Sequence, residues 1–266
     1  MPGRVTWHPA KLSPLTHLNL HLQVAGRIGS LIAQGKLAPG SVLPNESQLG
    51  TKFGVSRTAL REAIKVLAAK GLVEVRRKTG TRVRPNSHWN MLDGEVLTWL
   101  FSGTDVPAGL SDLLEVRKIV EPAGARMAAA RATPEDLAKM ESAFEAMETV
   151  AKDLDSRIEP DLLFHLAVLE GTRNGFMRPF GALIQTALRA SFRLTSSNSV
   201  AYQRTLTLHR AVLEAIKSRN GQKAEAAMLM VLAQTSRDIA AESKKSKKWI
   251  RLTIKRRYSR QQSEDA

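Results

Sequence analysis

Four titratable side chains occupy positions where the helical period predicts apolar residues. Asp161 and His165, four residues apart, border a stripe of leucines, and Arg117 and His209 each fall inside an apolar stripe. A buried charge without a partner is costly, so we expect these groups to satisfy one another or a ligand. Asp161 and His165 present an oxygen and an imidazole from one helix face, which is a spacing that zinc or a similar divalent ion can use.

Each of these residues also has a simpler interpretation. His209 can be a hydrogen-bonded core histidine, and Asp161 with His165 can be a local pair. Arg117 can pair with an acid that faces the core, or it can clamp a ligand carboxylate, because a guanidinium offers paired donors. A metal-dependent hydrolase is a further alternative. The sequence contains no HExxH, phosphate-loop or nucleophile motif to support such an enzyme.

The elements that must position these side chains are helices. Thr133-Pro134-Glu135-Asp136 is a strong helix start, with a capping hydroxyl, a proline at the first position and acids in the first turn. Asn220-Gly221 marks another boundary. Helical patterns predict an all-α bundle of about six helices over residues 92–101, 110–130, 134–151, 157–171, 176–195 and 200–241, the last broken near Asn220.

Composition limits the class of protein. A chain of 266 residues with 43% apolar residues can bury a normal core in one or two domains. It contains no cysteine, which excludes disulfides and thiolate metal sites. We find no secretory signal pattern and no run of roughly 20 apolar residues, so we expect a cytoplasmic protein without membrane contact.

Charge is divided unevenly along the chain. Residues 1–85 hold 14 Lys and Arg against 3 Asp and Glu, whereas residues 86–240 hold 17 against 19. A basic N-terminal third on a near-neutral body indicates one module made for a polyanion. Nucleic acid is the favoured partner over a membrane surface or merely solubilising charge.

That basic third has the order of a helix-turn-helix. A first amphipathic helix is predicted from Leu18 to near Gly35, and a short second helix follows Pro44 and ends at Gly54. Ser56 can then cap a third helix by accepting a backbone N–H. A helix, a glycine turn and a capped helix together favour DNA binding.

The third helix has a candidate reading face. Arg57, Arg61 and Lys65 align at i, i+4 and i+8, opposite an apolar face, although a solvated charged face is the alternative. Arginine can donate two hydrogen bonds to guanine in the major groove. Two short β-like runs over 72–75 and 81–83 then predict a hairpin wing with a basic tip at 76–80. The predicted DNA-binding residues are Ser56, Arg57, Thr58, Arg61, Lys65, Arg77, Lys78, Thr79 and Gly80.

The series LAPGSVLPNESQLGTKFGVSRTALREAIKVLAAKGLVEVRRKTGTRV resembles the DNA-binding domain of the GntR family of regulators. The resemblance implies a homodimeric regulator, not an enzyme, in which Arg57 and Arg61 touch double-stranded operator DNA. Ser47 stands where the family's LPxER motif has arginine, so a contact from the second helix is expected to be absent or altered.

The helical body resembles the effector domain of the FadR-like branch of that family. This implies that Asp161, His165 and His209 are metal ligands beside an effector, with Val231 at the usual fourth position. The segments WNMLDGEVLTWLF and EVRKIVEPAGARMAAARAT resemble the subgroup that represses sugar-acid catabolism. The effector would then be a sugar acid such as D-galactonate, held by Arg117, Asp161, His165 and His209. Another organic acid or acyl ligand is the alternative.

These patterns divide the chain into an extension (1–14), the winged helix-turn-helix (15–85), a linker (86–91), an effector-binding and dimerisation domain (92–243) and a basic tail (244–266). We expect the helix near Trp89 and Trp99 to transmit the effector signal, because it follows the linker directly. The tail carries nine basic residues between Lys244 and Arg260. It is interpreted as a solvated segment or as a non-specific DNA contact.

Overall fold

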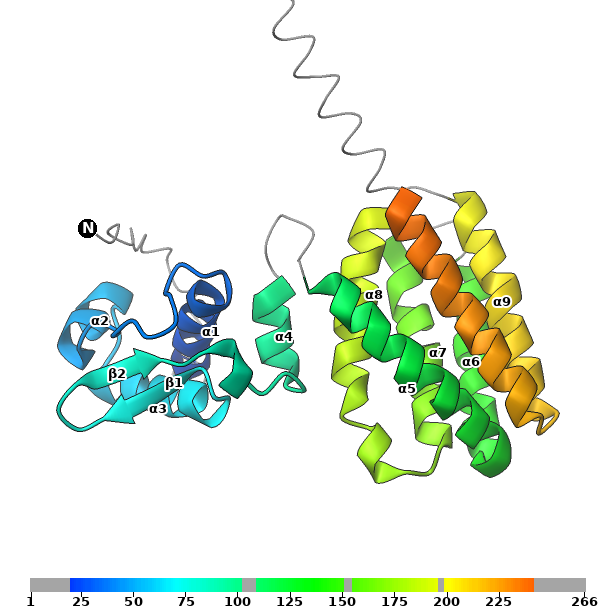
Figure 1. Ribbon diagram of the computed structural model, residues 1–266, viewed down its shortest axis with the longest axis horizontal. Coiled ribbons are helices and arrows are strands. Elements are labelled where there is room, and N and C mark those ends of the chain that lie inside the picture. The colour runs from blue at the N-terminus through cyan, green and yellow to red at the C-terminus, as the bar shows by residue number, and fades with distance from the viewer. Residues whose placement is uncertain (1–19, 102–108, 151–154, 196–198, 242–266) are drawn as a thin grey trace, which may run out of the picture. The chain divides into compact units, whose positions relative to one another are not determined.

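The computed structural model describes residues 20–101, 109–150, 155–195 and 199–241 (Figure 1). The chain forms two compact units, residues 1–107 and 108–266. The basic tail and the N-terminal extension lie outside the described residues. Among the helices that are described, none has the length and apolarity to cross a membrane.

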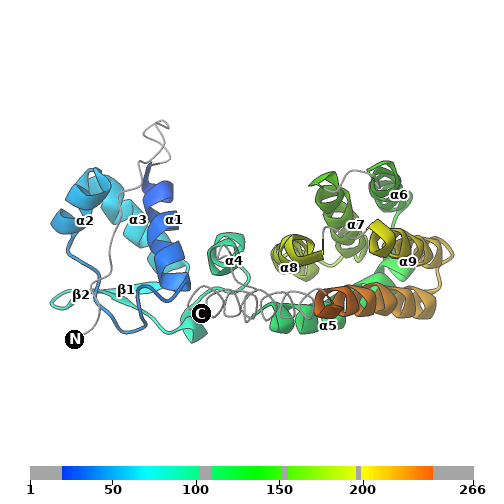
Figure 2. The same cartoon turned by 90° about the horizontal axis from the view of Figure 1, so that it is seen from above.

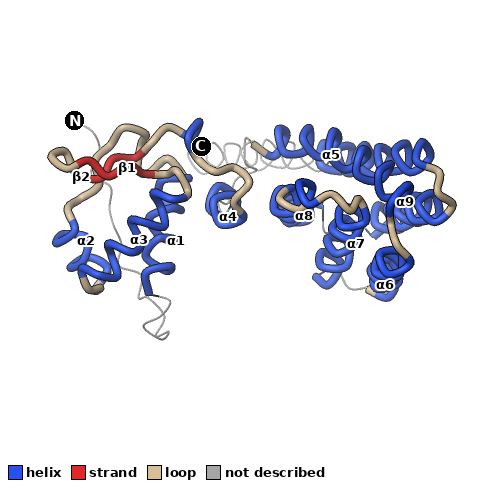
Figure 3. Tube along the Cα trace, turned by 90° about the horizontal axis from the view of Figure 1, so that it is seen from below, coloured by secondary structure: helices blue, strands red, loops and turns tan. Residues whose placement is uncertain are grey.

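The N-terminal unit begins with a winged helix-turn-helix, as predicted. Its elements are α1 (Leu20–Ala33), α2 (Glu46–Phe53), α3 (Arg57–Ala69), β1 (Val73–Arg76) and β2 (Gly80–Val83). The two strands pair antiparallel, with Val73 opposite Val83, and form the hairpin shown in red in Figure 3. Packing of α1 against α3, and of α3 against β1, gives this unit its core.

The turn between α2 and α3 is fixed by local chemistry. Asn45 caps α2 in a reciprocal capping box with Gln48. Gly54 then ends the helix with φ of 65°, a conformation that glycine adopts without a Cβ clash. Ser56 caps α3 by accepting from the Ala59 N–H at 3.2 Å. These three features fix the end of α2 and the start of α3, and so they define the turn of the helix-turn-helix.

A further helix, α4 (Gly94–Phe101), belongs to this unit as well. The sequence pattern predicts that residues 92–101 belong to the effector domain, but Val96 and Trp99 are buried in the same core as α1 and α3. The preceding segment holds a 3₁₀ turn, η2 (Asn86–His88), and a buried Trp89. Burial of these apolar side chains against α1 is the reason that α4 joins the DNA-reading unit.

The C-terminal unit is an all-α bundle, which confirms the predicted fold class. It contains α5 (Leu110–Arg131), α6 (Pro134–Thr149), α7 (Ile158–Gly171), α8 (Phe180–Thr195), α9 (Ser199–Lys217), the short turns η3 (Asp155–Arg157) and η4 (Gly175–Met177), and a last helix over residues 221–241. The helical structure is interrupted at Asn220, as the sequence predicts. Thr133 caps α6 in a capping box with Asp136, and Pro134 occupies the first turn.

The central helix of this bundle is α7. It packs against α5, α6 and α8, and Figure 2 shows it between α6 and α8. Its exposed positions, Glu159, Leu163 and Glu170, share one narrow stripe, and the rest of the helix is buried or half-buried. Asp161 and His165 lie outside this stripe, so both polar side chains are buried in the bundle.

Candidate functional site

Five buried polar side chains meet inside the bundle. Arg117 and Glu121 come from α5, Asp161 and His165 from α7, and His209 from α9. His209 Nε2 lies 3.1 Å from Asp161 Oδ1 and 3.2 Å from His165 Nε2. His165 Nε2 lies 3.9 Å from Asp161 Oδ1. The structure thus brings together the three residues that the sequence suggested as metal ligands.

The opposite ring nitrogens define the protonation of the two histidines. His209 Nδ1 lies 2.8 Å from the Thr205 carbonyl oxygen, which can only accept, so Nδ1 donates. His165 Nδ1 lies 2.5 Å from Glu121 Oε2, in a short contact that departs from the direction of an ideal hydrogen bond. Two unprotonated acceptors would repel at that distance, so this nitrogen also carries the proton. In the neutral rings, both Nε2 atoms therefore present lone pairs to the cluster.

The third converging atom is a carboxylate oxygen. Burial alone would raise the pKa of Asp161, but the proximity of His209 outweighs it and lowers that pKa below its usual value. Asp161 Oδ1 is buried and accepts no hydrogen bond of good geometry from the described residues. Three acceptors thus face one another at the centre of the cluster.

This donor set fits a divalent metal. Bond lengths of about 2.0–2.2 Å to zinc place tetrahedral ligand atoms roughly 3.3 Å from one another, and the three separations here run from 3.1 to 3.9 Å. A proton on one Nε2 would satisfy one contact, whereas a divalent cation satisfies all three. Val231, at the usual fourth position, is a buried apolar residue without a ligand atom. Three protein ligands leave coordination positions open for a bound molecule.

Arg117 is paired with an acid, the simpler of its two interpretations. Its Nε donates to Glu121 Oε1 in an ion pair whose side chains are both 1% exposed. Burial would raise the pKa of Glu121, but Arg117 and His165 outweigh it and lower that pKa to about 2. Arg117 Nη1 is buried and has no hydrogen-bond partner within the described part of the chain. Arg117 therefore retains a donor for a ligand despite its ion pair.

Glu121 is a site residue that was not predicted from the sequence. The residue lies four positions after Arg117, and this i, i+4 spacing was the available indication of the pair. Glu121 contacts Arg117 and His165, so it joins the arginine to the metal-ligand cluster.

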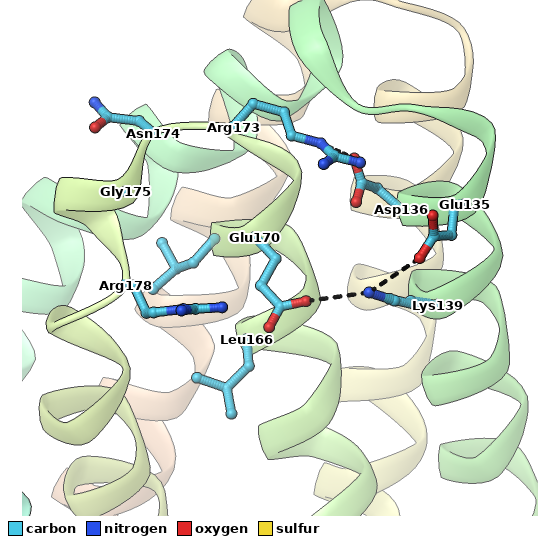
Figure 4. Close-up of a pocket in the computed structure, with 10 residues that line it drawn as sticks. Glu135, Asp136, Lys139, Leu166, Glu170, Arg173, Asn174, Gly175 and Arg178 are labelled. Carbon is cyan, nitrogen blue, oxygen red and sulfur yellow. Dashed lines mark hydrogen bonds and ion pairs between the residues drawn. The ribbon is translucent and has the colours of Figure 1, made fainter.

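A surface pocket of about 540 Å³ lies elsewhere in the bundle, and its lining includes residues of α6 and α7 (Figure 4). Lys139 lies between Glu135 and Glu170, at 3.5 and 3.7 Å. Arg173 pairs with Asp136 at 2.7 Å. None of the predicted effector residues lines this pocket. Its charges largely compensate one another, so we do not assign the effector to it.

The reading face of α3 is open to solvent. Arg57, Thr58, Arg61 and Lys65 are all exposed, while Ser56 is engaged as the helix cap. Local acids hold two of the cations loosely: Lys65 Nζ lies 2.8 Å from Glu62, and Arg61 Nε lies 3.8 Å from Glu46. Such exposed pairs contribute little stability and can be exchanged for phosphates.

The wing adds a second basic surface. Its tip residues Arg77, Lys78, Thr79 and Gly80 are exposed, and Gly80 has φ of 83°. On α2, Ser47 is also exposed, and it has a side chain too short for the charged contact that an arginine would make. DNA contact by these individual residues remains a prediction.

Comparison with known proteins decides the family. Residues 20–83 match the family described as bacterial regulatory proteins, gntR family, and residues 112–234 match the FCD domain. The galactonate operon transcriptional repressor of Escherichia coli (strain K12) is 38% identical over 221 residues, which cover 83% of this chain and 96% of that protein. The chain belongs to the GntR family.

Two further proteins match this chain over a similar length. The HTH-type transcriptional regulator LutR of Bacillus subtilis (strain 168) is 31% identical over 204 residues, covering 75% of this chain and 91% of LutR. The solved structure of Lar, which controls the expression of the Listeria monocytogenes agr system, matches 87% of this chain and 99% of that one with a TM-score of 0.61 and 20% identity. The Lar likeness shows the fold alone. This GntR protein is thus a transcriptional regulator with an FCD domain, not an enzyme, and α4 lies between its two matched regions.

Proposed function

We propose that this GntR protein represses a sugar-acid catabolic operon and leaves its operator when a sugar acid such as D-galactonate binds the FCD domain. The observation that carries the proposal is the buried cluster in which Arg117 retains a donor beside three converging acceptors. Similarity to the galactonate operon repressor over nearly its whole length supports the effector class.

The chemistry of the cluster suits a hydroxylated carboxylate. Asp161, His165 and His209 would hold a divalent metal, which when bound supplies a Lewis-acidic position for a carboxylate or hydroxyl oxygen. Arg117 Nη1 would donate to a carboxylate oxygen of the same effector, in a charge-assisted hydrogen bond. Burial strengthens this interaction because water does not compete for either partner.

Effector binding at this place would act on three helices at once, because the cluster is built from α5, α7 and α9. Induction requires that the effector binds more tightly to the packing that disfavours DNA. A coupling of about 1–3 kcal/mol between the two sites is typical, and it is reciprocal. We propose a homodimer whose α3 helices enter successive major grooves about 34 Å apart.

The test compares Arg117→Met with wild type in operator binding, with D-galactonate, gluconate, lactate and acyl ligands tried in turn. We expect wild type to be released by a sugar acid, and Arg117→Met to bind the operator normally but to resist release. Lys118→Met is the matched control, because Lys118 is an exposed neighbour with the same charge. Full release of Arg117→Met would exclude the carboxylate role, and release of wild type by lactate or an acyl ligand alone would exclude the sugar acid.

A further inference from the structure

We infer that Glu121 is a positioning residue that orients His165 toward Asp161 and His209 while it holds Arg117 beside them. The inference deepens the proposed function, since it rests on the same effector site. Glu121 is not itself one of the three converging ligand residues. Its role follows from the two contacts that its carboxylate makes.

The first contact selects the tautomer of His165. Glu121 Oε2 lies 2.5 Å from His165 Nδ1, and both side chains are 1% exposed. A carboxylate at this place favours the proton on Nδ1, which leaves the Nε2 lone pair for the cluster. In water an imidazole samples both tautomers, whereas the buried carboxylate shifts this equilibrium of His165 toward the Nδ1–H tautomer. Carboxylates beside the outer nitrogen of a ligating histidine orient the ring and raise its basicity.

The second contact holds the anion-binding group. The other Glu121 oxygen pairs with Arg117 Nε, and Arg117 Nη2 lies 3.4 Å from Glu121 Oε2. This ion pair compensates the guanidinium charge in the interior, while Nη1 has no hydrogen-bond partner among the described residues. One carboxylate therefore sets both the ligand geometry of His165 and the position of Arg117. Affinity for a cation and affinity for an effector carboxylate should both depend on Glu121.

The test separates Glu121 from the charge of Arg117. Removing Glu121 alone would leave Arg117 buried without its partner, whereas removing Arg117 alone leaves Glu121 its contact with His165. We therefore compare full-length Arg117→Met with the double variant Arg117→Met/Glu121→Leu. In the double variant, apolar side chains replace both members of the ion pair, an exchange that buried pairs often tolerate. The first readout is the His165 tautomer in metal-free protein, from ¹⁵N chemical shifts and long-range couplings. The second is Zn²⁺ affinity, measured by competition with a chromophoric chelator.

We expect Arg117→Met to keep the Nδ1–H tautomer and to bind Zn²⁺ at least as tightly as wild type, because a buried positive charge near the site is removed. The double variant should populate both tautomers and bind Zn²⁺ about 10–100-fold more weakly. If the double variant does not fold, Glu121→Gln replaces it as the test variant. Its amide oxygen can still accept from Nδ1, so the tautomer should be kept and Zn²⁺ affinity should fall by less than in the double variant.

The matched control is Asp136→Asn. Asp136 is also a buried acid paired with an arginine, but that arginine is Arg173 and does not belong to the cluster. This variant should leave both readouts unchanged. An unaltered tautomer and affinity in the double variant would overturn the inference, as would full wild-type affinity together with a lost tautomer preference in Glu121→Gln. If wild type binds no Zn²⁺, the metal part of the proposed function fails, and the tautomer in metal-free protein still decides the role of Glu121.

Discussion

Gly29 of α1 lies directly against the indole ring of Trp99 in α4. A Cβ added at position 29 would fall 2.3 Å from Trp99 Cε3, closer than real Cβ atoms approach any heavy atom. The missing side chain is thus what admits the indole to the core of the N-terminal unit. Lys70, the C-cap residue of α3, reinforces the attachment of α4, with its Nζ at 2.6 Å from Asp93 and 2.8 Å from Glu95.

Replacing this glycine should loosen α4. We expect Gly29→Ala to destabilise the N-terminal unit by about 1–3 kcal/mol, as overpacking of a core does. Urea unfolding followed by tryptophan fluorescence measures the change. Gly26→Ala is the matched control, because its Cβ would lie 3.7 Å from Trp99 Nε1, an ordinary contact. That change should be neutral or stabilising by up to about 1 kcal/mol. Equal losses in both variants would contradict the steric explanation.

The reading face and the wing should respond differently to substitution. Arg57→Ala should reduce the preference for the operator over scrambled DNA by about 1–3 kcal/mol, since a base contact carries sequence information. Lys78→Ala should weaken binding to both DNAs equally and lower the salt slope by about 1. Fluorescence anisotropy at several salt concentrations separates the two effects. Lys223→Ala removes an exposed charge from the other unit and should change neither.

Zinc binding should stabilise the wild-type bundle. A free Zn²⁺ concentration about 100 times its Kd would add about 2.7 kcal/mol, and a chelator would remove this gain. We expect Asp161→Asn to lose the gain and yet to be more stable than wild type without metal, because its amide can donate to His209 Nε2, 3.1 Å from the present oxygen. Thermal unfolding with Zn²⁺ and with chelator tests both parts. A metal-free Asp161→Asn that melts below wild type would argue against three converging acceptors.

Acid should weaken the bundle through Glu121. Its pKa is lowered from 4.5 to about 2 in the folded protein, so its ionised form is the one that folding favours. The stabilisation is fully present above pH 4.5 and is lost as the pH falls through about 2. The free energy of unfolding should therefore fall more steeply over this window in wild type than in Glu121→Gln. Parallel curves for the two proteins would show that Glu121 does not titrate with folding.

Much of the fold follows from local chemistry in the sequence. The Ser56 cap, the Gly54 turn and the Thr133-Pro134 start each satisfy free backbone groups at a helix end, and these effects need no distant partner. The helix ends were therefore predictable to within a few residues at most positions. The fold class and the order of elements follow from these ends together with the apolar periodicity.

Long-range partnerships could not be predicted in the same way. The sequence indicated that Asp161 and His165 share a face, but only the packing of α9 against the rest of the bundle brings His209 to them. Arg117 illustrates the limit, since its position in an apolar stripe was evident while the identity of its acid was not. Trp99 shows the same limit for α4. The sequence does not indicate which unit this helix packs in, because only the structure shows that the Trp99 ring lies against Gly29.

The attachment of α4 has a consequence for exchanging domains between regulators. The region matched to the GntR family ends at residue 83, and a fusion joined there would strip away Trp89, Val96 and Trp99. Water would then enter the space against Gly29. The truncated DNA-binding domain would expose the apolar surface that α4 covers, and such a surface favours self-association. A chimera that joins this winged helix-turn-helix to another effector domain should be fused after Phe101, so that α4 stays with the N-terminal unit whose core it completes.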